Sequence, residues 1–222
     1  MTEITIDKII RSKRRSIALI VSSDAQLVVR APMRTSLEYI NGLVFRKRLW
    51  INRKKEQALK NGASAKPKQF TDGEEFYYLG KVYKLVFEDC HTISLADCFY
   101  FPEKHVSVCR ERIIKWYKQM AKEKITERAQ WYSRITGWKY NALSVTSAMT
   151  RWGSCGYNGS VNFSWRLIMA PIEVVDYVVV HELAHIAEKN HSDKFWNKVK
   201  VILPDYKERQ RWLRENRVML NI

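Results

Sequence analysis

The sequence predicts an α+β protein in which a strand-rich N-terminal lobe carries one basic helix and the C-terminal lobe is mainly helical. Short runs of β-branched residues dominate the first hundred positions, and helical periodicity begins near residue 104. Hydrophobic residues make up 46% of the 222 residues, which is enough for a globular core. We therefore expect lobes at residues 1–103 and 104–222, or one continuous domain across both.

The N-terminal lobe is expected to begin with a β-hairpin followed by a helix. Residues 15–21 and 27–31 are rich in β-branched residues and are separated by a turn-forming segment at 22–24. Thr35 then fits the N-cap of a capping box with Glu38 at the third helical position. Apolar residues at helical spacing continue from there, so one helix is predicted at about 36–61.

Further short strands and a long helix follow. Residues 63–75 resemble a linker, and residues 76–87 form a second expected hairpin that turns near Gly80. Strands are also predicted at 92–95 and 99–101. Helical periodicity then covers 104–136 and ends at Gly137.

The last third combines two strands with a buried helix. Strands are predicted at 144–149 and 160–165, on either side of a tight segment at 151–156. Residues 171–188 are almost entirely apolar, which predicts a buried helix that starts at Pro171. Two shorter helices should follow, with N-caps at Ser192 and Asp205.

The charge balance indicates anionic partners. Lys and Arg number 39 against 23 Asp and Glu, so the net charge is +16. Residues 1–62 carry 14 of the basic residues against 5 acidic ones. No apolar run reaches the roughly 18 residues of a membrane span, and no secretory signal is visible, so we expect a cytoplasmic protein without a membrane partner. The oligomeric state is not predicted.

The predicted N-terminal helix holds a cluster of cations that suits a phosphate backbone. Nucleic acid is therefore a second partner to consider beside a peptide or protein, although a solvated helix face explains the same charges. The anion-binding set consists of Arg46, Lys47, Arg48, Arg53, Lys54 and Lys55.

The buried helix contains His181, Glu182 and His185 in the pattern HExxH. Two His residues four positions apart differ by about 40° around a helix, so both imidazoles reach one metal ion. Glu182 lies beside that ion and is placed to act as general base toward a metal-activated water. A mostly apolar helix that buried these groups without a metal would lose several kcal/mol.

His191 is the nearest third ligand. An unbroken helix would carry it about 9 Å beyond His185 along the axis and onto another side, so the helix must end first. Asn190 tolerates the left-handed backbone that ends helices, and Ser192 favours an N-cap. The sequence therefore predicts a chain reversal beside the metal.

The chain resembles the YgjP-like metallopeptidase family of small zincins, which is related at the motif level to SprT-like and WLM proteases. Residues 10–16 (IRSKRRS) and the helix through Trp50 and Ile51 are similar to the basic N-terminal region of the family, so the resemblance covers essentially the whole chain. The resemblance rests on residues 151–155 (RWGSC), Asn162, Leu167 with Pro171, residues 177–185 (YVVVHELAH), His191–Ser192 and Phe195–Trp196. It implies a zincin-like core and Zn²⁺ held by His181, His185 and His191, with Glu182 catalytic. The implied activity is zinc-dependent hydrolysis of peptide bonds.

Several roles stay open at this point. Arg151 and Trp152 either line the substrate cleft or form a structural turn, and Tyr157 either reaches the substrate or is an ordinary loop residue. A peptide substrate is expected to add to a strand edge at 144–149 or 160–165. The alternative function is a nucleic-acid-associated protein whose zinc site is structural or vestigial.

Overall fold

The chain folds into two compact units in a computed structural model that describes residues 4–22, 24–64, 68–217, 219–220 and 222. The units are Met1–Pro67 and Lys68–Ile222, and each has its own hydrophobic core. The division therefore lies at 67/68 and differs from the expected 103/104. Strands at 75–102 share the core of the C-terminal helices, because Phe76, Leu85 and Phe99 are buried with Ile113 and Tyr117.

The first unit is a three-stranded sheet with two helices. Its elements are β1 (Lys8–Ser12), β2 (Ala18–Val21), β3 (Leu27–Pro32), α1 (Leu37–Arg46) and α2 (Arg48–Ser64). The strand order is β1-β3-β2, with β1 parallel and β2 antiparallel to β3. The predicted hairpin is confirmed as β2–β3, although residue 23 of its turn lies outside the described residues. Strand β1 was not predicted, because only two residues of its segment KIIRS are apolar.

The expectation of one helix at about 36–61 was wrong. Lys47 leaves helical geometry at φ −97° and ψ 10°, and its amide donates to the carbonyls of both Leu43 and Val44. No Pro or Gly marks this break, so periodicity alone passes over it. The N-cap is Ser36 rather than Thr35, because the Ser36 hydroxyl accepts from the Tyr39 amide at 3.2 Å.

The second unit opens with a four-stranded sheet. Its strands are β4 (Glu75–Tyr78), β5 (Lys81–Glu88), β6 (Ser94–Leu95) and β7 (Phe99–Pro102), in the order β4-β5-β7-β6. The predicted hairpin is confirmed as β4–β5 and turns at Leu79–Gly80. A Cβ on Gly80 would lie 2.8 Å from Pro171 Cγ, so glycine lets this turn pack against the start of the next buried helix.

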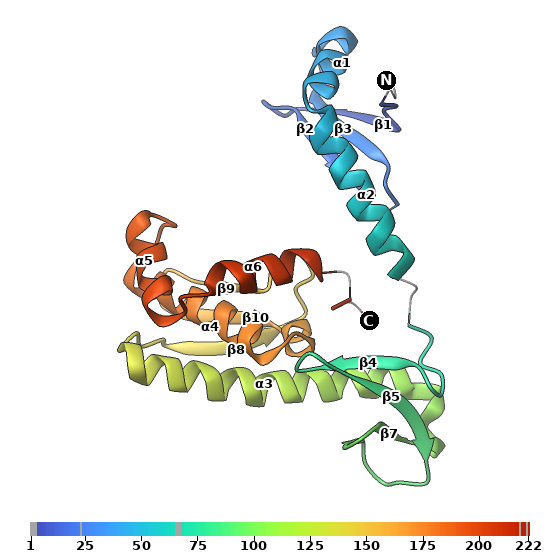
Figure 1. Ribbon diagram of the computed structural model, residues 1–222, viewed down its shortest axis with the longest axis vertical. Coiled ribbons are helices and arrows are strands. Elements are labelled where there is room, and N and C mark those ends of the chain that lie inside the picture. The colour runs from blue at the N-terminus through green and yellow to red at the C-terminus, as the bar shows by residue number, and fades with distance from the viewer. Residues whose placement is uncertain (1–3, 23, 65–67, 218, 221) are drawn as a thin grey trace. The chain divides into compact units, whose positions relative to one another are not determined.

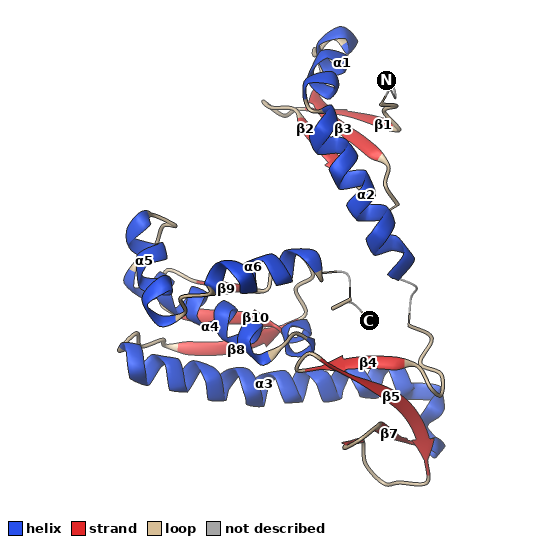
Figure 2. Ribbon diagram, in the orientation of Figure 1, coloured by secondary structure: helices blue, strands red, loops and turns tan. Residues whose placement is uncertain are grey.

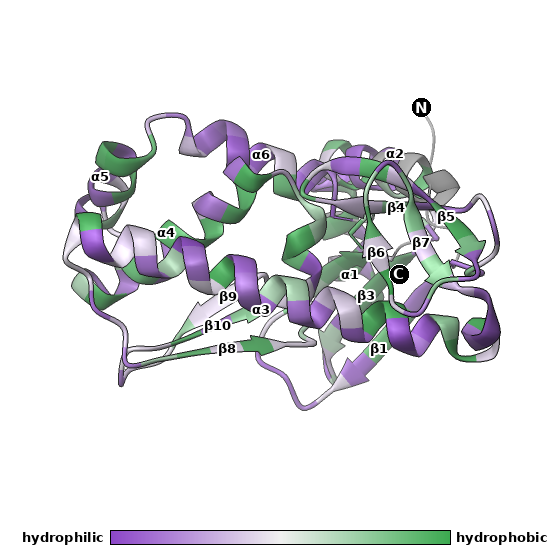
Figure 3. Cartoon of the chain, turned by 90° about the horizontal axis from the view of Figure 1, so that it is seen from below, coloured by the Kyte–Doolittle hydropathy of each residue, from purple (hydrophilic) through white to green (hydrophobic). Residues whose placement is uncertain are grey.

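A long helix, α3 (Cys109–Thr136), supports both sheets of the second unit. It follows a 3-10 segment at Glu103–Val108 and ends at Gly137, whose φ of 74° is the left-handed cap that the sequence predicted. Hydrophobic and hydrophilic bands alternate along α3, which matches a helix with one buried face (Figure 3). In Figure 1, β8 (Ala142–Thr146) and β4 lie along different stretches of α3.

The C-terminal part forms a second small sheet and three helices (Figure 2). The strand order is β8-β10-β9, and β10 is parallel to β8 and antiparallel to β9. The elements are β8 (Ala142–Thr146), β9 (Gly153–Cys155), β10 (Ser160–Ser164), α4 (Ile172–Ala187), α5 (Asp193–Ile202) and α6 (Tyr206–Glu215).

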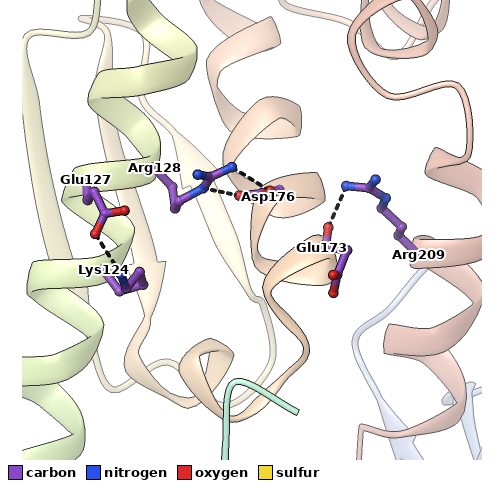
Figure 4. A network of polar contacts seen from close by, with 6 residues as sticks. All are labelled: Lys124, Glu127, Arg128, Glu173, Asp176 and Arg209. Carbon is purple, nitrogen blue, oxygen red and sulfur yellow. Dashed lines mark hydrogen bonds and ion pairs between the residues drawn. The ribbon is translucent and has the colours of Figure 1, made fainter.

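Polar contacts hold the first half of α4 on two sides (Figure 4). Arg128 of α3 donates to both carboxylate oxygens of Asp176, at 2.6 and 2.8 Å. Arg209 of α6 donates to the backbone carbonyl of Glu173 at 2.9 Å. The buried helix is therefore fixed before its last two turns, which carry the HExxH residues. No described helix is long and apolar enough to cross a membrane.

Candidate metal centre

Helix α4 presents two imidazoles and a carboxylate near its C-terminal end. Residues Val174–Val180 are all buried, so packing fixes the rotation of the helix about its axis. His181 and His185 then follow at a spacing of one turn, and their ring centroids lie 5.1 Å apart. The prediction that the two imidazoles lie close together, one turn apart on one helix, is confirmed.

The chain reverses after α4 and returns His191 to the same place. Helix α4 ends at Ala187, and Glu188 is extended at φ −144° and ψ 110°. His191 Nε2 lies 2.9 Å from His181 Nε2. The reversal was predicted, but its mechanism differs: Asn190 is not among the described residues with positive φ, and the extended Glu188 turns the chain instead.

Aromatic packing holds the third imidazole. Ser192 caps α5 by accepting from the Phe195 amide at 3.4 Å. This orientation brings the Phe195 ring to 4.9, 4.5 and 4.8 Å from the rings of His181, His185 and His191. Trp196 stacks on His191 at 5.6 Å. Phe195 is therefore a core residue whose ring also packs against all three imidazoles.

Burial keeps two of the imidazoles neutral, the form that binds metal. Desolvation, followed by the neighbouring His185 and His191, lowers the pKa of His181 to about 3. Burial likewise lowers the pKa of His185. The Nδ1 atom of His185 lies 3.2 Å from the Glu188 carbonyl, which orients Nε2 toward the cluster. His181 Nδ1 is buried and has no hydrogen-bond partner among the described residues.

The three side chains fit a divalent metal ion. Each offers one ring nitrogen, and the three atoms lie within 4.8 Å of one another. A tetrahedral zinc ion with Zn–N bonds of about 2.0–2.1 Å places its ligand atoms roughly 3.3 Å apart, so small rotations of the rings complete the site. Three imidazoles with a fourth position free for substrate are also a donor set typical of catalytic zinc.

Glu182 follows His181 on α4 and is buried, with 6% of its surface exposed. Its side chain packs on the backbone of Gly153 in β9, where a Cβ would lie 2.6 Å from Glu182 Cγ and Oε1. Burial raises the pKa of Glu182 to about 7, and the positive charge of Arg151 opposes this shift. Sequence reasoning missed the contact with Gly153, which joins segments 29 positions apart.

Strand β9 is a free edge beside this carboxylate. The sequence suggested strands at 144–149 or 160–165 as the edge that receives a peptide. The second is wrong, because β10 is the central strand of its sheet, whereas β8 and β9 form the two edges among the described residues. The segment 151–156, expected as a tight turn, contains β9 at Gly153–Cys155.

The remaining residues of the predicted cleft border β9. Arg151 is exposed and close enough to Glu182 to affect its pKa. Trp152 is half-buried against the core. Tyr157 is 95% exposed at the β9–β10 turn, with Lys189 Nζ 5.9 Å from its ring centroid.

The predicted anion-binding residues lie in the other unit, Met1–Pro67. Arg46, Lys47, Arg48 and Arg53 are exposed, whereas Lys54 and Lys55 are half-buried. Lys55 Nζ forms an ion pair with Asp7 at 3.4 Å, so this cation is already partly neutralised.

Comparisons with known proteins identify the family of the chain. Among solved structures, the crystal structure of the metallopeptidase zymogen of Pyrococcus abyssi abylysin is similar at 19% identity, with a TM-score of 0.38. The match covers 41% of this chain and 93% of that one. No curated protein matches the chain. The model of the YgjP-like metallopeptidase domain matches residues 15–216, which include residues 15–67 of the first unit and nearly the whole of the second. With its three imidazoles and buried carboxylate inside that match, the chain belongs to the YgjP-like metallopeptidase family.

Proposed function

We propose that this chain is a zinc-dependent peptidase in which His181, His185 and His191 hold the metal and Glu182 is the general base. The observation that carries the proposal is the convergence of three ring nitrogens within 4.8 Å, with Glu182, which is 6% exposed, next to His181 in the chain. When bound, zinc supplies Lewis acidity, which polarises a substrate carbonyl and lowers the pKa of a water ligand.

The chain's own groups orient the reactants and move the proton. Glu182 receives the proton of the attacking water on its carboxylate and delivers it to the departing amine. Arg151 has a charge that influences Glu182, so it is suited to stabilise negative charge on the carbonyl oxygen. Phe195 excludes water from one side of the imidazoles.

The substrate is proposed to be an extended segment of a peptide or protein. Strand β9 has an unpaired edge among the described residues, and its Gly153 touches Glu182, so a segment added to β9 would pass the carboxylate. Arg151 and Trp152 precede this edge and Tyr157 follows it, so these three residues would border the cleft.

We further propose a reducing compartment such as the cytoplasm. The four cysteines, Cys90, Cys98, Cys109 and Cys155, are all free thiols. Free thiols are typical of proteins in such compartments, where disulfides are rare.

Two variants separate the metal site from the chemistry. His185→Ala removes a ligand and should abolish stoichiometric zinc binding, measured by metal analysis of the purified protein. Glu182→Gln keeps the three imidazoles, so it should retain zinc while losing hydrolysis of an unstructured protein substrate. Full activity of Glu182→Gln would refute the mechanism. Zinc binding without hydrolysis in the unaltered chain would instead favour a structural metal site.

A further inference from the structure

The unit Met1–Pro67 carries a basic and aromatic surface that peptide hydrolysis does not use. Residues 45–50, Phe-Arg-Lys-Arg-Leu-Trp, cross the junction between α1 and α2, and all six are exposed. Arg53 lies one turn farther along α2 and is also exposed. We call these seven residues the elbow surface.

The elbow surface is not needed by the core of its unit. Ile40, Val44 and Ile51 turn inward and are at most 4% exposed. The helices therefore direct Phe45 and Leu49 into water, where they are 62% and 70% exposed. Apolar side chains that are grouped outside a core and bordered by charge mark interaction sites.

The cations of the elbow surface are held beside aromatic rings and remain available to a ligand. The Arg48 guanidinium carbon lies 4.4 Å from the Phe45 ring centroid, and Nη1 donates to the Phe45 carbonyl at 3.1 Å. The Arg46 guanidinium lies 5.9 Å from the Tyr39 ring. Neither arginine forms an ion pair with a residue that the structure describes, and the same holds for Lys47 and Arg53.

We propose that the elbow surface binds single-stranded nucleic acid. Its four cations attract the phosphate backbone, and arginine is well suited to phosphate because its planar guanidinium donates several hydrogen bonds. Phe45 and Trp50, which are 62% and 42% exposed, offer rings on which unpaired bases stack. A duplex hides its base faces and would leave these rings unused.

Membrane binding fits the same surface less well. A helix that lies on a lipid surface buries a continuous apolar stripe along its length. On the exposed side of α2, Asn52, Arg53 and Glu56 interrupt Leu49 and Trp50. Beyond the junction, the next large exposed apolar side chain among the described residues of α2 is Leu59, nine positions after Trp50, so these groups form no continuous stripe along the helix. The group at the junction, Phe45, Leu49 and Trp50, has a size that suits a few bases.

The test uses the full chain and a fluorescein-labelled single strand of poly(dT) of about 20 nucleotides, longer than the roughly 4–16 nucleotides that one binding domain covers. Fluorescence anisotropy gives Kd between about 50 and 200 mM salt. The variant Arg46→Gln/Arg48→Gln/Arg53→Gln should bind at least about tenfold more weakly, with a salt slope smaller by about 2. Phe45→Leu/Trp50→Leu keeps apolar bulk but removes the rings, and it should weaken binding about tenfold.

A charge-matched control separates this surface from the general positive charge of the chain. Lys207→Gln/Arg211→Gln/Arg214→Gln removes three exposed cations from α6 in the other unit and should bind like the unaltered protein. Circular dichroism of each variant verifies that it is folded. The Glu182→Gln variant should also bind normally, because this proposal is independent of peptidase activity.

Four outcomes would overturn the proposal. These are normal binding by the elbow arginine variant, an equal loss in the α6 control, equal or tighter binding of a duplex of the same length, and binding of phosphatidylserine vesicles without binding of the oligonucleotide. Unchanged affinity of the leucine variant would overturn base stacking on Phe45 and Trp50.

Discussion

A methyl group at residue 153 should displace the carboxylate that we assign as general base. The Cβ of Gly153→Ala would lie 2.6 Å from Glu182 Cγ and Oε1 and 2.8 Å from Cδ. The carboxylate would have to retreat by roughly 0.8 Å to reach 3.4 Å, where ordinary van der Waals contact begins. Gly153 is not among the described glycines with positive φ, so the clash with Glu182 alone requires glycine here.

The expected effect is a slower reaction at an intact metal site. A misplacement of about 1 Å in a catalytic group lowers the rate on the order of 10²-fold, so we expect kcat to fall roughly 10- to 100-fold. Overpacking should reduce the free energy of unfolding by about 1–3 kcal/mol. The three atoms nearest to the new Cβ all belong to Glu182, so we expect the zinc content to stay unchanged.

The assay combines steady-state cleavage of an unstructured protein with metal analysis of the same samples. Gly42→Ala is the matched control, because the nearest atom to its new Cβ, Arg46 Nη1, is 3.6 Å away. It should leave kcat unaltered. If Gly153→Ala kept zinc and at least about half of kcat, the rate would not depend on the position of the Glu182 carboxylate, and the reasoning would be refuted. Loss of zinc together with activity would contradict the reasoning as well.

Three further predictions concern stability. Asp176→Asn should lower the free energy of unfolding by about 3 kcal/mol, because the part-buried Arg128 loses its anionic partner. Denaturant unfolding measures this free energy, and a loss below about 1 kcal/mol would argue against the prediction. Ser192→Ala should lower the free energy of unfolding by about 1 kcal/mol, because it removes the cap of α5. It should also weaken zinc affinity in calorimetric titration, because His191 directly precedes the cap. Unaltered zinc affinity would show that the cap does not position His191. The Leu27 amide, which donates to Asp7 at 2.6 Å, lowers the pKa of Asp7 below its usual value. Because the pKa of Asp7 is lower in the folded than in the unfolded protein, its ionised carboxylate stabilises the fold at pH values above the unfolded pKa. This contribution is lost as the pH falls through the folded pKa. The free energy of unfolding of the Met1–Pro67 unit should therefore decrease below about pH 4. Asp7→Asn should remove that part of the acid dependence, and an identical pH profile of unfolding in the variant would count against it.

The parts of the site that depend on local spacing were predictable. His181 and His185 share a face because a helix repeats every 3.6 residues, and the buried run before them identifies that helix. The N-cap preference of Ser192 and the required helix end likewise predicted the return of His191. Each of these relations joins residues within about three helical turns, where backbone geometry limits the alternatives.

Relations between distant segments were not predictable in this way. The sequence did not indicate that Gly153 and Glu182 touch, that β9 is the free edge, or that strands at 75–102 share a core with α3. The break at Lys47 has no local marker, and it determines which cations and rings of residues 45–50 face water.

The residue types and their spacing along the chain were enough to predict the three-histidine cluster, the helix that carries His181 and His185, and the excess of positive charge in residues 1–62. The folded chain was needed to see which backbone supports Glu182, which strand edge faces it and which basic side chains are exposed or paired. Side-chain type and spacing act along a single element. Edges, close contacts and burial arise when elements pack, and that packing depends on complementary shapes of segments far apart in the chain.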